Sequence, residues 1–359
     1  MKILHLDTGR TLRGGQRQVL LLMQGLRSWG ASQILLSPAG APTVMPARRA
    51  GLPVAEIPVG TFANLSTFQS VRRTILGFQP DVLHLHDARA HGFGYLANRT
   101  LKRPMVVSRR VAFPLQMNFW SRYKYFAPRQ RFIAVSLFVK GLMVDSGIQP
   151  ALIDVVYDCV DLTIEAGGGS QARTGLSSEQ FIVGTVGALE PEKGHDVLIE
   201  AMGRLRSSLP QCRCIIAGEG SLKPRLQAMI AVHHLENTVQ IVPPPDSLTG
   251  LLCGMDLFVL PSRVEGLGSI ILLAMHCGIP VLASTAGGIP ELVENETTGF
   301  LFEKGDVGAL TRALLTLSDN PTQRHQVIEK AATRIRSQFS VEAMTEATLS
   351  IYQKALAAS

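Results

Sequence analysis

Short runs of apolar residues alternate with amphipathic segments twice along this chain. In the first half the apolar runs are KILHLDT, SQILLSP, DVLHLH, MVVS, FIAVS and DVVYDCVD. The second half begins again at FIVGTVGAL and continues with CIIAG, VQIVP, LFVLPS and PVLAS. Short buried strands separated by helix-length segments are typical of parallel sheets with helices on both faces. The pattern therefore predicts an α/β protein with two doubly wound, Rossmann-like domains.

The two series of strands are separated by a weakly patterned, glycine-rich stretch at residues 163–180, TIEAGGGSQARTGLSSEQ, which we interpret as a linker. We therefore predict an amino-terminal domain at residues 1–165 and a carboxyl-terminal domain at residues 175–340. After Asp306 the pattern is helical to the end, with no further strand. The closing helix, at 341–359, could pack across both domains and back onto the amino-terminal one.

The length and composition agree with this picture. A chain of 359 residues suits two domains, and 46% hydrophobic residues with 33 Gly and 20 Pro indicate a globular α/β protein. The first residues, MKILHLDTGR, resemble a first strand rather than a signal peptide, and no stretch approaches the ~20 apolar residues that span a bilayer. The five cysteines are odd in number and form no Cys-x-x-Cys pair, which favours reduced thiols in the cytoplasm.

Charge is unevenly distributed. The net charge is +7, yet residues 88–144 contain no Asp or Glu. Eleven basic residues fall in that segment: Arg89, Arg99, Lys102, Arg103, Arg109, Arg110, Arg122, Lys124, Arg129, Arg131 and Lys140. Inside it, residues 113–126 (FPLQMNFWSRYKYF) interleave aromatic and basic side chains, a mixture that suits an anionic membrane surface. A solvated basic face with a few core aromatics is the plainer alternative. Nucleic acid is not expected as a partner, because no nucleic-acid-binding motif accompanies the charge.

The candidate functional residues lie directly after the predicted strands. In open parallel sheets, ligands bind beyond the carboxyl ends of strands, where glycine turns expose helix amides. Gly14 and Gly15 follow the first strand and precede a helix, so their amides could face an anion, although turns need glycine anyway. In DVLHLHD, we expect His84 in the core and His86 at the end of the strand, where it can donate to a hydroxyl or phosphate.

The second half contains comparable junctions. Glu190, Glu192 and Lys193 lie between a strand and a helix, and Lys193 could neutralise a phosphate or be an ordinary surface lysine. After LFVLPS, Glu265 is placed to accept hydrogen bonds from hydroxyls, and Gly268 and Ser269 are expected to open a helix. STAGGIPELV, at residues 284–293, is a further strand–glycine–helix junction. Phosphate-binding amides beside hydroxyl-binding carboxylates predict a cleft for a phosphorylated sugar compound.

These motifs, in this order, resemble glycosyltransferase family 4, the retaining glycosyltransferases of the GT-B type (glycosyl transferases group 1). The resemblance covers nearly the whole chain and includes DVLHLHD, FIAVSLFVKGLMVDSGI, VVYDCVDL, VGALEPEKGHDVLIEAM, AGEGSLKPRL, VLPSRVEGLGSIILLAM and GIPVLASTAGGIPELV. It implies two Rossmann-like domains that face a central cleft, with the nucleotide-sugar donor bound mainly by the second. It also implies a hexosyl or related transfer to an acceptor hydroxyl, with retention and without a metal or other cofactor.

The resemblance also suggests partners. The donor is expected to be UDP- or GDP-linked, and the acceptor a glycan or a lipid-linked molecule in the synthesis of cell-envelope polysaccharide, lipopolysaccharide or glycolipid. The protein is then expected in the cytoplasm, peripheral on the inner face of the cell membrane.

Site residues are carried over position by position. Gly14 and Gly15 correspond to the loop that approaches the donor diphosphate, Lys193 to its cationic clamp, and His86 to the histidine near the transferred sugar. Glu265 corresponds to the first carboxylate of the Glu-x7-Glu motif, which holds sugar hydroxyls. Catalytic roles therefore fall to His86, Glu265 and Lys193. Donor contacts are also expected from the loop and helix that follow Glu265: Gly266, Leu267, Gly268, Ser269 and Leu273.

Three positions depart from the family pattern. Leu273 stands where an acidic residue grips the ribose, Ala188 replaces the arginine that assists Lys193, and Cys159 stands at a usual glycine. A lost hydrogen bond to a charged group weakens donor binding by about tenfold to a hundredfold. A weakened transferase is the leading hypothesis, and a degenerate, non-catalytic nucleotide- or lipid-binding protein is the alternative. An epimerase or phosphorylase on the same architecture lacks supporting motifs.

Overall fold

A computed structural model describes residues 1–58, 65–115, 118–164, 180–245 and 247–358. The chain divides into two compact units. The first unit contains Met1–Asp161 together with Ser340–Ser359, and the second contains Leu162–Phe339. Most of the predicted linker at residues 163–180 lies outside the described residues.

The first unit is built on a seven-stranded sheet with the order β3-β2-β1-β4-β5-β6-β7, in which every neighbouring pair is parallel. Its strands are β1 (Lys2–Leu6), β2 (Ser32–Pro38), β3 (Val54–Ile57), β4 (Val82–Leu85), β5 (Met105–Arg109), β6 (Gln130–Ala134) and β7 (Ile153–Val155). The central strand β4 is buried along its whole length, as a strand with helices on both faces must be.

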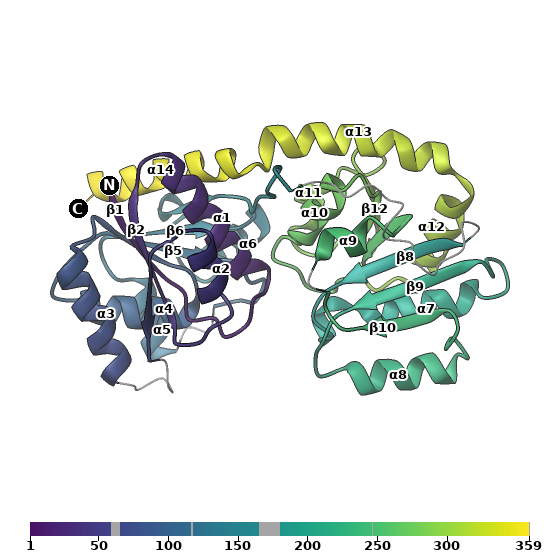
Figure 1. Ribbon diagram of the computed structural model, residues 1–359, viewed down its shortest axis with the longest axis horizontal. Helices are drawn as coiled ribbons and strands as arrows, with labels where there is room; N and C mark the ends of the chain where they lie inside the picture. Colours follow the sequence, from purple (N-terminus) through teal and green to yellow (C-terminus); the bar gives the residue numbers. More distant parts are fainter. Residues whose placement is uncertain (59–64, 116–117, 165–179, 246, 359) are drawn as a thin grey trace. The chain divides into compact units, whose positions relative to one another are not determined.

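Helices connect these strands on both sides of the sheet (Figure 1). They are α1 (Gly14–Ser28), α2 (Val44–Arg49), α3 (Leu65–Phe78), α4 (Ala88–Asn98), α5 (Phe119–Tyr125), α6 (Leu137–Asp145) and the 3-10 turn η1 (Pro150–Leu152), and the unit is completed by the last helix of the chain, α14 (Val341–Ala357).

The second unit contains a six-stranded parallel sheet with the order β10-β9-β8-β11-β12-β13. Its strands are β8 (Phe181–Val186), β9 (Cys212–Ala217), β10 (Val239–Val242), β11 (Leu257–Leu260), β12 (Val281–Ser284) and β13 (Phe300–Phe302). Its helices are η2 (Pro191–Lys193), α7 (His195–Leu205), α8 (Lys223–Val232), α9 (Leu248–Leu252), α10 (Ile270–His276), α11 (Ile289–Leu292), α12 (Val307–Asp319) and α13 (Pro321–Gln338).

The prediction of two doubly wound, Rossmann-like α/β domains is confirmed by these two sheets. In each of them the chain starts in the middle, builds outward to one edge, and then returns to build the other half. Two strands were not predicted from the apolar runs, namely β3 and β13. β3 is an edge strand with an exposed Glu56, and β13 has only three residues, so neither has the long apolar run of a central strand.

The closing helix α14 packs against α1 and against the first sheet (Figure 1). Its Tyr352 is fully buried and its hydroxyl lies 2.6 Å from Nδ1 of His84 on β4. Gly25 of α1 allows the two helices to approach closely, because a Cβ at this position would overlap Oγ1 of Thr345. The last segment of the chain is therefore part of the core of the first unit.

We expect the substitution Gly25→Ala to lower the free energy of unfolding by about 1–3 kcal/mol, because the added methyl group pushes α1 away from α14. Gly141→Ala is the matched control: this glycine is exposed in the middle of α6, with nothing within 4 Å of an added Cβ. Alanine there should raise stability by about 0.5–1 kcal/mol. Chemical denaturation of both variants measures the difference, and equal behaviour of the two would show that the α1–α14 contact is not tight.

Candidate functional site

The most convincing pair of site residues lies at the carboxyl edge of the second sheet. Lys193 ends the turn η2, which follows β8, and Glu265 lies in the loop that follows β11. Nζ of Lys193 is 2.6 Å from Oε2 of Glu265, and the two side chains are 24% and 14% exposed. The structure thus brings these two predicted residues together in one partly buried ion pair.

The two loops that carry this pair are fastened to each other through their main chains. The carbonyl of Glu192 accepts hydrogen bonds from the amides of Arg263 (2.8 Å) and Val264 (3.2 Å). Gly194 adopts a φ of +64°, and a Cβ there would overlap the carbonyl oxygen of Pro261. Only glycine fits this junction, because it tolerates both the left-handed backbone and the close approach.

Further hydrogen bonds orient Glu265. Its Oε2 also accepts a hydrogen bond from Oγ of Ser262 (3.1 Å), and its carbonyl accepts from the amide of Gly288 (3.2 Å). Oε1 has no partner among the described residues, so one carboxylate oxygen is available to a ligand. Lys193 uses one of its three ammonium hydrogens on Glu265, which leaves two for an anion.

The loop after Glu265 leads into a short helix. Gly268 and Ser269 were expected to open it, and Ser269 is the N-cap residue of α10, which begins at Ile270 and spans seven residues. Gly268 is held in the left-handed region, with a φ of +88°, which ends the extended segment before the helix can start. The residues from Gly266 to Ser269 therefore form a loop beside Glu265, and its amides from Leu267 onward have no acceptor among the described residues.

Leu273 and Ala188, two of the positions that depart from the family pattern, are both half-buried. Leu273 is half-buried on α10, between Leu272 and Ala274, which are fully buried. Ala188 is also half-buried, and its carbonyl accepts a hydrogen bond from Nε2 of His195 (3.1 Å). Neither side chain is locked inside the hydrophobic core, so both positions border on solvent.

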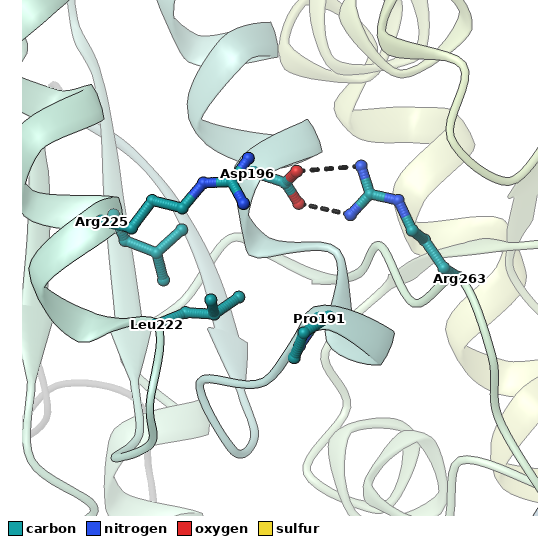
Figure 2. A pocket seen from close by; sticks show the side chains of 6 residues that line it. Pro191, Asp196, Leu222, Arg225 and Arg263 are labelled. Atoms are coloured by element: carbon teal, nitrogen blue, oxygen red, sulfur yellow. Dashed lines mark hydrogen bonds and ion pairs between the residues drawn. The ribbon is translucent and has the colours of Figure 1, made fainter.

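A cavity of about 290 Å³ lies next to the η2 loop (Figure 2). Arg263 and Asp196 border it and form a two-pronged ion pair, with N–O distances of 2.5 and 2.9 Å. Although burial alone would raise the pKa of Asp196, the hydrogen bonds and charge of Arg263 lower it. The remaining lining residues are Pro191, Leu222, Arg225 and Leu226. Because its walls are largely apolar and the ion pair is satisfied, this cavity has less polar chemistry to offer than the Lys193–Glu265 loops.

In the first unit, the helix after β1 begins two residues earlier than expected. Gly14 and Gly15 do not precede α1 but form its first turn, after the N-cap residue Arg13. A Cβ at Gly15 would lie 3.6 Å from Cδ of Arg110, the residue that follows β5. Arg110 in turn pairs with Asp158, with 3.2 Å between Nε and Oδ1.

Histidines 84 and 86 differ less than expected in their burial. His84 is in the core, as predicted, and hydrogen-bonds both Tyr352 and Ser108. His86 lies at the end of β4, but it is only 6% exposed, and its Nε2 is 3.0 Å from Nδ1 of His5.

Asp7 and Asp87 were missed by the sequence analysis, although Asp7 lies at the end of the predicted run KILHLDT and Asp87 directly follows DVLHLH. Asp87 caps α4 and also accepts hydrogen bonds from the amide and hydroxyl of Thr8, which joins the loops after β1 and β4. Asp7 is 2% exposed, and burial, assisted by the charge of Asp87, raises its pKa to about 6. An acidic residue at the end of a strand was the signal that could have identified both.

Three histidines of the first unit could in principle ligate a metal ion. His5, His84 and His86 each offer a ring nitrogen, and these atoms lie within 4.8 Å of one another. The rings already hydrogen-bond each other or neighbouring hydroxyl groups, so a metal would have to displace those bonds. The absence of a metal from the reaction stays a prediction.

The basic, aromatic segment predicted at residues 113–126 includes α5; Gln116 and Met117 lie outside the described residues. Several of its large aromatic side chains are more than half exposed: Phe113, Phe119, Trp120, Tyr123 and Phe126. Not all of the neighbouring cations are free, because Arg110 pairs with Asp158 and Arg131 with Asp154. Within the described part of the chain, no helix combines the length and apolar character required to cross a membrane.

Comparison with known proteins gives similar sequences and structures. D-inositol 3-phosphate glycosyltransferase of Mycobacterium tuberculosis is 33% identical over 223 residues, which is 58% of this chain and 45% of that protein. The match thus spans less than half the length of this curated relative. HepE of Anabaena, solved in complex with UDP and glucose, superimposes with a TM-score of 0.86 at 23% identity and covers 99% of this chain and 100% of its own. A glycosyltransferase from Rickettsia africae has a TM-score of 0.85 at 21% identity, with 99% and 98% covered.

The structural neighbours show that the fold is that of the GT-B glycosyltransferases, as the sequence resemblance implied. Two family models match the chain directly. Residues 12–164 match Glycosyltransferase Family 4, and residues 170–334 match Glycosyl transferases group 1. Because the two matches account for most of both units, the chain belongs to the group 1, family 4 glycosyltransferases.

Proposed function

We propose that this protein transfers a hexosyl or related sugar from a UDP- or GDP-linked donor to an acceptor hydroxyl, with retention and without a metal ion. The observation that carries the proposal is the Lys193–Glu265 pair at the carboxyl edge of the second sheet. A cation suited to a diphosphate and a carboxylate suited to sugar hydroxyls lie within one hydrogen bond of each other. The neighbour HepE was solved with UDP and glucose, which supports a donor of this class.

In this proposal the diphosphate binds to the two remaining ammonium hydrogens of Lys193 and to the open amides of the loop that ends at Ser269. The sugar then places a hydroxyl on Oε1 of Glu265, the oxygen that has no partner among the described residues. As the bond between sugar and phosphate breaks, negative charge grows on the leaving phosphate oxygen and Lys193 stabilises it. That oxygen can accept the proton of the acceptor hydroxyl, so no protein nucleophile is needed.

Removing either member of the pair tests this assignment. We expect Lys193→Met and Glu265→Gln each to weaken binding of the donor about tenfold to a hundredfold, since each removes hydrogen bonds to a charged group. Arg204→Gln is the control, because Arg204 forms an exposed ion pair with Glu200 on α7 and is not in the site. A panel of UDP- and GDP-sugars, followed by calorimetric titration and by transfer to candidate acceptors, measures the effect. Unchanged donor affinity in both variants would contradict the site.

The positions of Leu273 and Ala188 make a second test possible. Leu273→Glu places a carboxylate on a half-buried position of α10, where it can meet the ribose, and Ala188→Arg adds a cation near the diphosphate. We expect each change to tighten nucleotide binding by up to about tenfold, and the two effects to be roughly additive, since they concern different parts of the ligand. Nucleotide titration with melting temperatures alongside measures both.

The outcome of that test also bears on the alternative, a non-catalytic binding protein. If Leu273→Glu lowers the melting temperature and leaves nucleotide binding unchanged, the new carboxylate is buried without a partner and the ribose site has been lost. Binding without transfer to any acceptor in the panel would then favour the non-catalytic hypothesis.

For the acceptor we propose a glycan or lipid-linked molecule of the cell envelope, such as a polysaccharide, lipopolysaccharide or glycolipid precursor, reached at the inner, cytoplasmic face of the membrane. Support comes from the exposed aromatic group on α5. The ring centroid of Phe119 lies 6.1 Å from that of Trp120 and 5.7 Å from that of Tyr123, with Arg122 exposed on the same short helix. Aromatic rings settle at the depth of lipid headgroups, and cations meet anionic lipids there.

We expect the protein to bind vesicles that contain anionic lipids and to be released by salt, because exposed charges are screened over about 8 Å at physiological ionic strength. The double variant Phe119→Ser, Trp120→Ser should reduce this binding at least about tenfold, given ~1.5–3 kcal/mol for each buried large apolar side chain. Trp29→Ser is the control, since Trp29 is also more than half exposed but follows α1. Sedimentation with neutral and anionic vesicles measures the binding; equal binding to both would remove the electrostatic part of the proposal.

A further inference from the structure

The three buried histidines of the first unit share one face of its sheet. His5 of β1 is paired in register with His84 of β4, and His86 follows two residues later, so the three side chains point to the same side. The three residues are 0%, 0% and 6% exposed. Burial lowers the pKa of His5 to about 3, and burial together with the neighbouring rings holds the pKa of His84 and His86 well below the usual range. All three rings are therefore neutral at pH 7.

A neutral imidazole has one N–H group and one bare nitrogen, so every hydrogen bond restricts which nitrogen carries the hydrogen. His84 is satisfied separately, by the hydroxyl groups of Tyr352 (2.6 Å) and Ser108 (2.8 Å). The remaining contact joins Nδ1 of His5 to Nε2 of His86 at 3.0 Å. One of these two nitrogens must donate and the other must accept, and the contact alone does not say which.

Gln33 of β2 determines which of these two nitrogens donates. Its Nε2 donates to the carbonyl of Met23 at 2.6 Å, and the reversed amide would place two oxygens against each other. The amide oxygen is thus the end that can meet His5. Gln33 and His5 lie on neighbouring strands, on the same face of the sheet, because Gln33 is paired in register with Ile3, two residues before His5. Nε2 of His5 and Oε1 of Gln33 are both buried and have no other partner among the described residues, so this nitrogen and this oxygen are left to face each other. In agreement, burial lowers the pKa of His5, and the side chain of Gln33 opposes that effect, as an acceptor does.

The side-chain oxygen of Gln33 then determines which ring nitrogen carries the hydrogen, first in His5 and next in His86. If Nε2 of His5 carries the hydrogen that faces Gln33, Nδ1 of His5 is bare. His86 must therefore donate from its Nε2, which leaves its own Nδ1 bare. This last atom is buried and has no partner among the described residues. His86 lies immediately after β4, at the carboxyl edge of the first sheet, where ligands of such sheets bind.

We propose that Gln33 and His5 are positioning residues that hold His86 as its Nε2–H tautomer, so that the bare Nδ1 accepts a hydrogen bond from a substrate hydroxyl. The inference rests on the proposed function for the identity of the substrate as a sugar or its acceptor. It also narrows the chemistry that His86 can recognise. A bare nitrogen accepts from a hydroxyl group, whereas the ionised phosphate oxygens have no hydrogen to give it.

The tautomer can be observed without any substrate. The full-length protein is labelled with ¹⁵N-histidine, and long-range proton–nitrogen correlation spectra at pH 7.5 distinguish a protonated from a bare ring nitrogen. The spectrum of His86→Gln assigns the signals of His86. We expect His86 to be protonated at Nε2 and bare at Nδ1, and His5 to show the same pattern. A hydrogen on Nδ1 of His86 in the wild-type protein would overturn the inference, whatever the activity.

Variants test whether Gln33, acting through His5, sets the tautomer of His86. Gln33→Leu removes the acceptor and should give His86 a mixture of tautomers. With an active donor–acceptor pair, Gln33→Leu should lower kcat/KM about fivefold, the worth of one ordinary hydrogen bond. His84→Gln is the matched control: His84 lies in the same cluster but bonds Tyr352 and Ser108, so the tautomer of His86 should not change, although its signals shift because the two ring centroids are 4.0 Å apart.

These readouts separate the inference from the proposed function. The expected tautomer in a protein that transfers no sugar would support the positioning of His86 and count against the transferase. If Gln33→Leu leaves the tautomer of His86 unchanged, or if His84→Gln alters it as much as Gln33→Leu does, Gln33 and His5 are not the residues that position His86.

Discussion

Parallel strand pairing is the constraint on which the rest of this structure depends. Every neighbouring pair in both sheets is parallel, so each strand must be followed by a crossover, and all carboxyl ends in a sheet meet at one edge. In the first unit this brings together the residues that follow β1 and β4, and in the second those that follow β8 and β11. The pairing of Lys193 with Glu265, 72 residues apart in the chain, is a direct consequence.

Ionic and polar groups at these edges are stabilised by one another. Lys193 and Glu265 are partly buried, and an uncompensated charge in such a place costs several kcal/mol. Their pairing, with Ser262 as a third member, keeps both ionised groups in position before a ligand arrives. The same reasoning applies to Arg110 with Asp158 in the first unit. Among the described residues, the Lys193–Glu265 pair leaves two ammonium hydrogens and Oε1 of Glu265 unused, and a polar ligand can bind to these atoms.

The closing helix links the core of the first unit to its candidate site. Tyr352 of α14 hydrogen-bonds His84, which lies in the middle of β4, two residues before His86. This contact satisfies a buried ring that would otherwise be costly, since an unpaired buried polar group destabilises a protein by about 1–3 kcal/mol. The carboxyl-terminal segment therefore contributes to the surroundings of His84, which lies 268 positions earlier in the chain than Tyr352.

The sequence by itself determined the class of fold and the approximate location of the site. Alternating apolar runs are sufficient to predict parallel sheets, because a strand that is buried on both faces appears in the sequence as a continuous apolar run. The edge strands β3 and β13 were not predicted, since a half-exposed or three-residue strand has no such run. Lys193, Glu265 and His86 were found because each follows a recognisable strand.

Only the tertiary structure decided how these residues meet. The start of α10 at Ile270 depends on the left-handed Gly268, and the place of Gly14 and Gly15 inside α1 depends on where the helix finds its first hydrogen bonds. The contact of His5 with Gln33 and His86 joins three strands and cannot be read from spacing, because register across a sheet is set by packing. Strand order, burial and hydrogen-bond partners are properties of the assembled core, and they decide what each side chain can do.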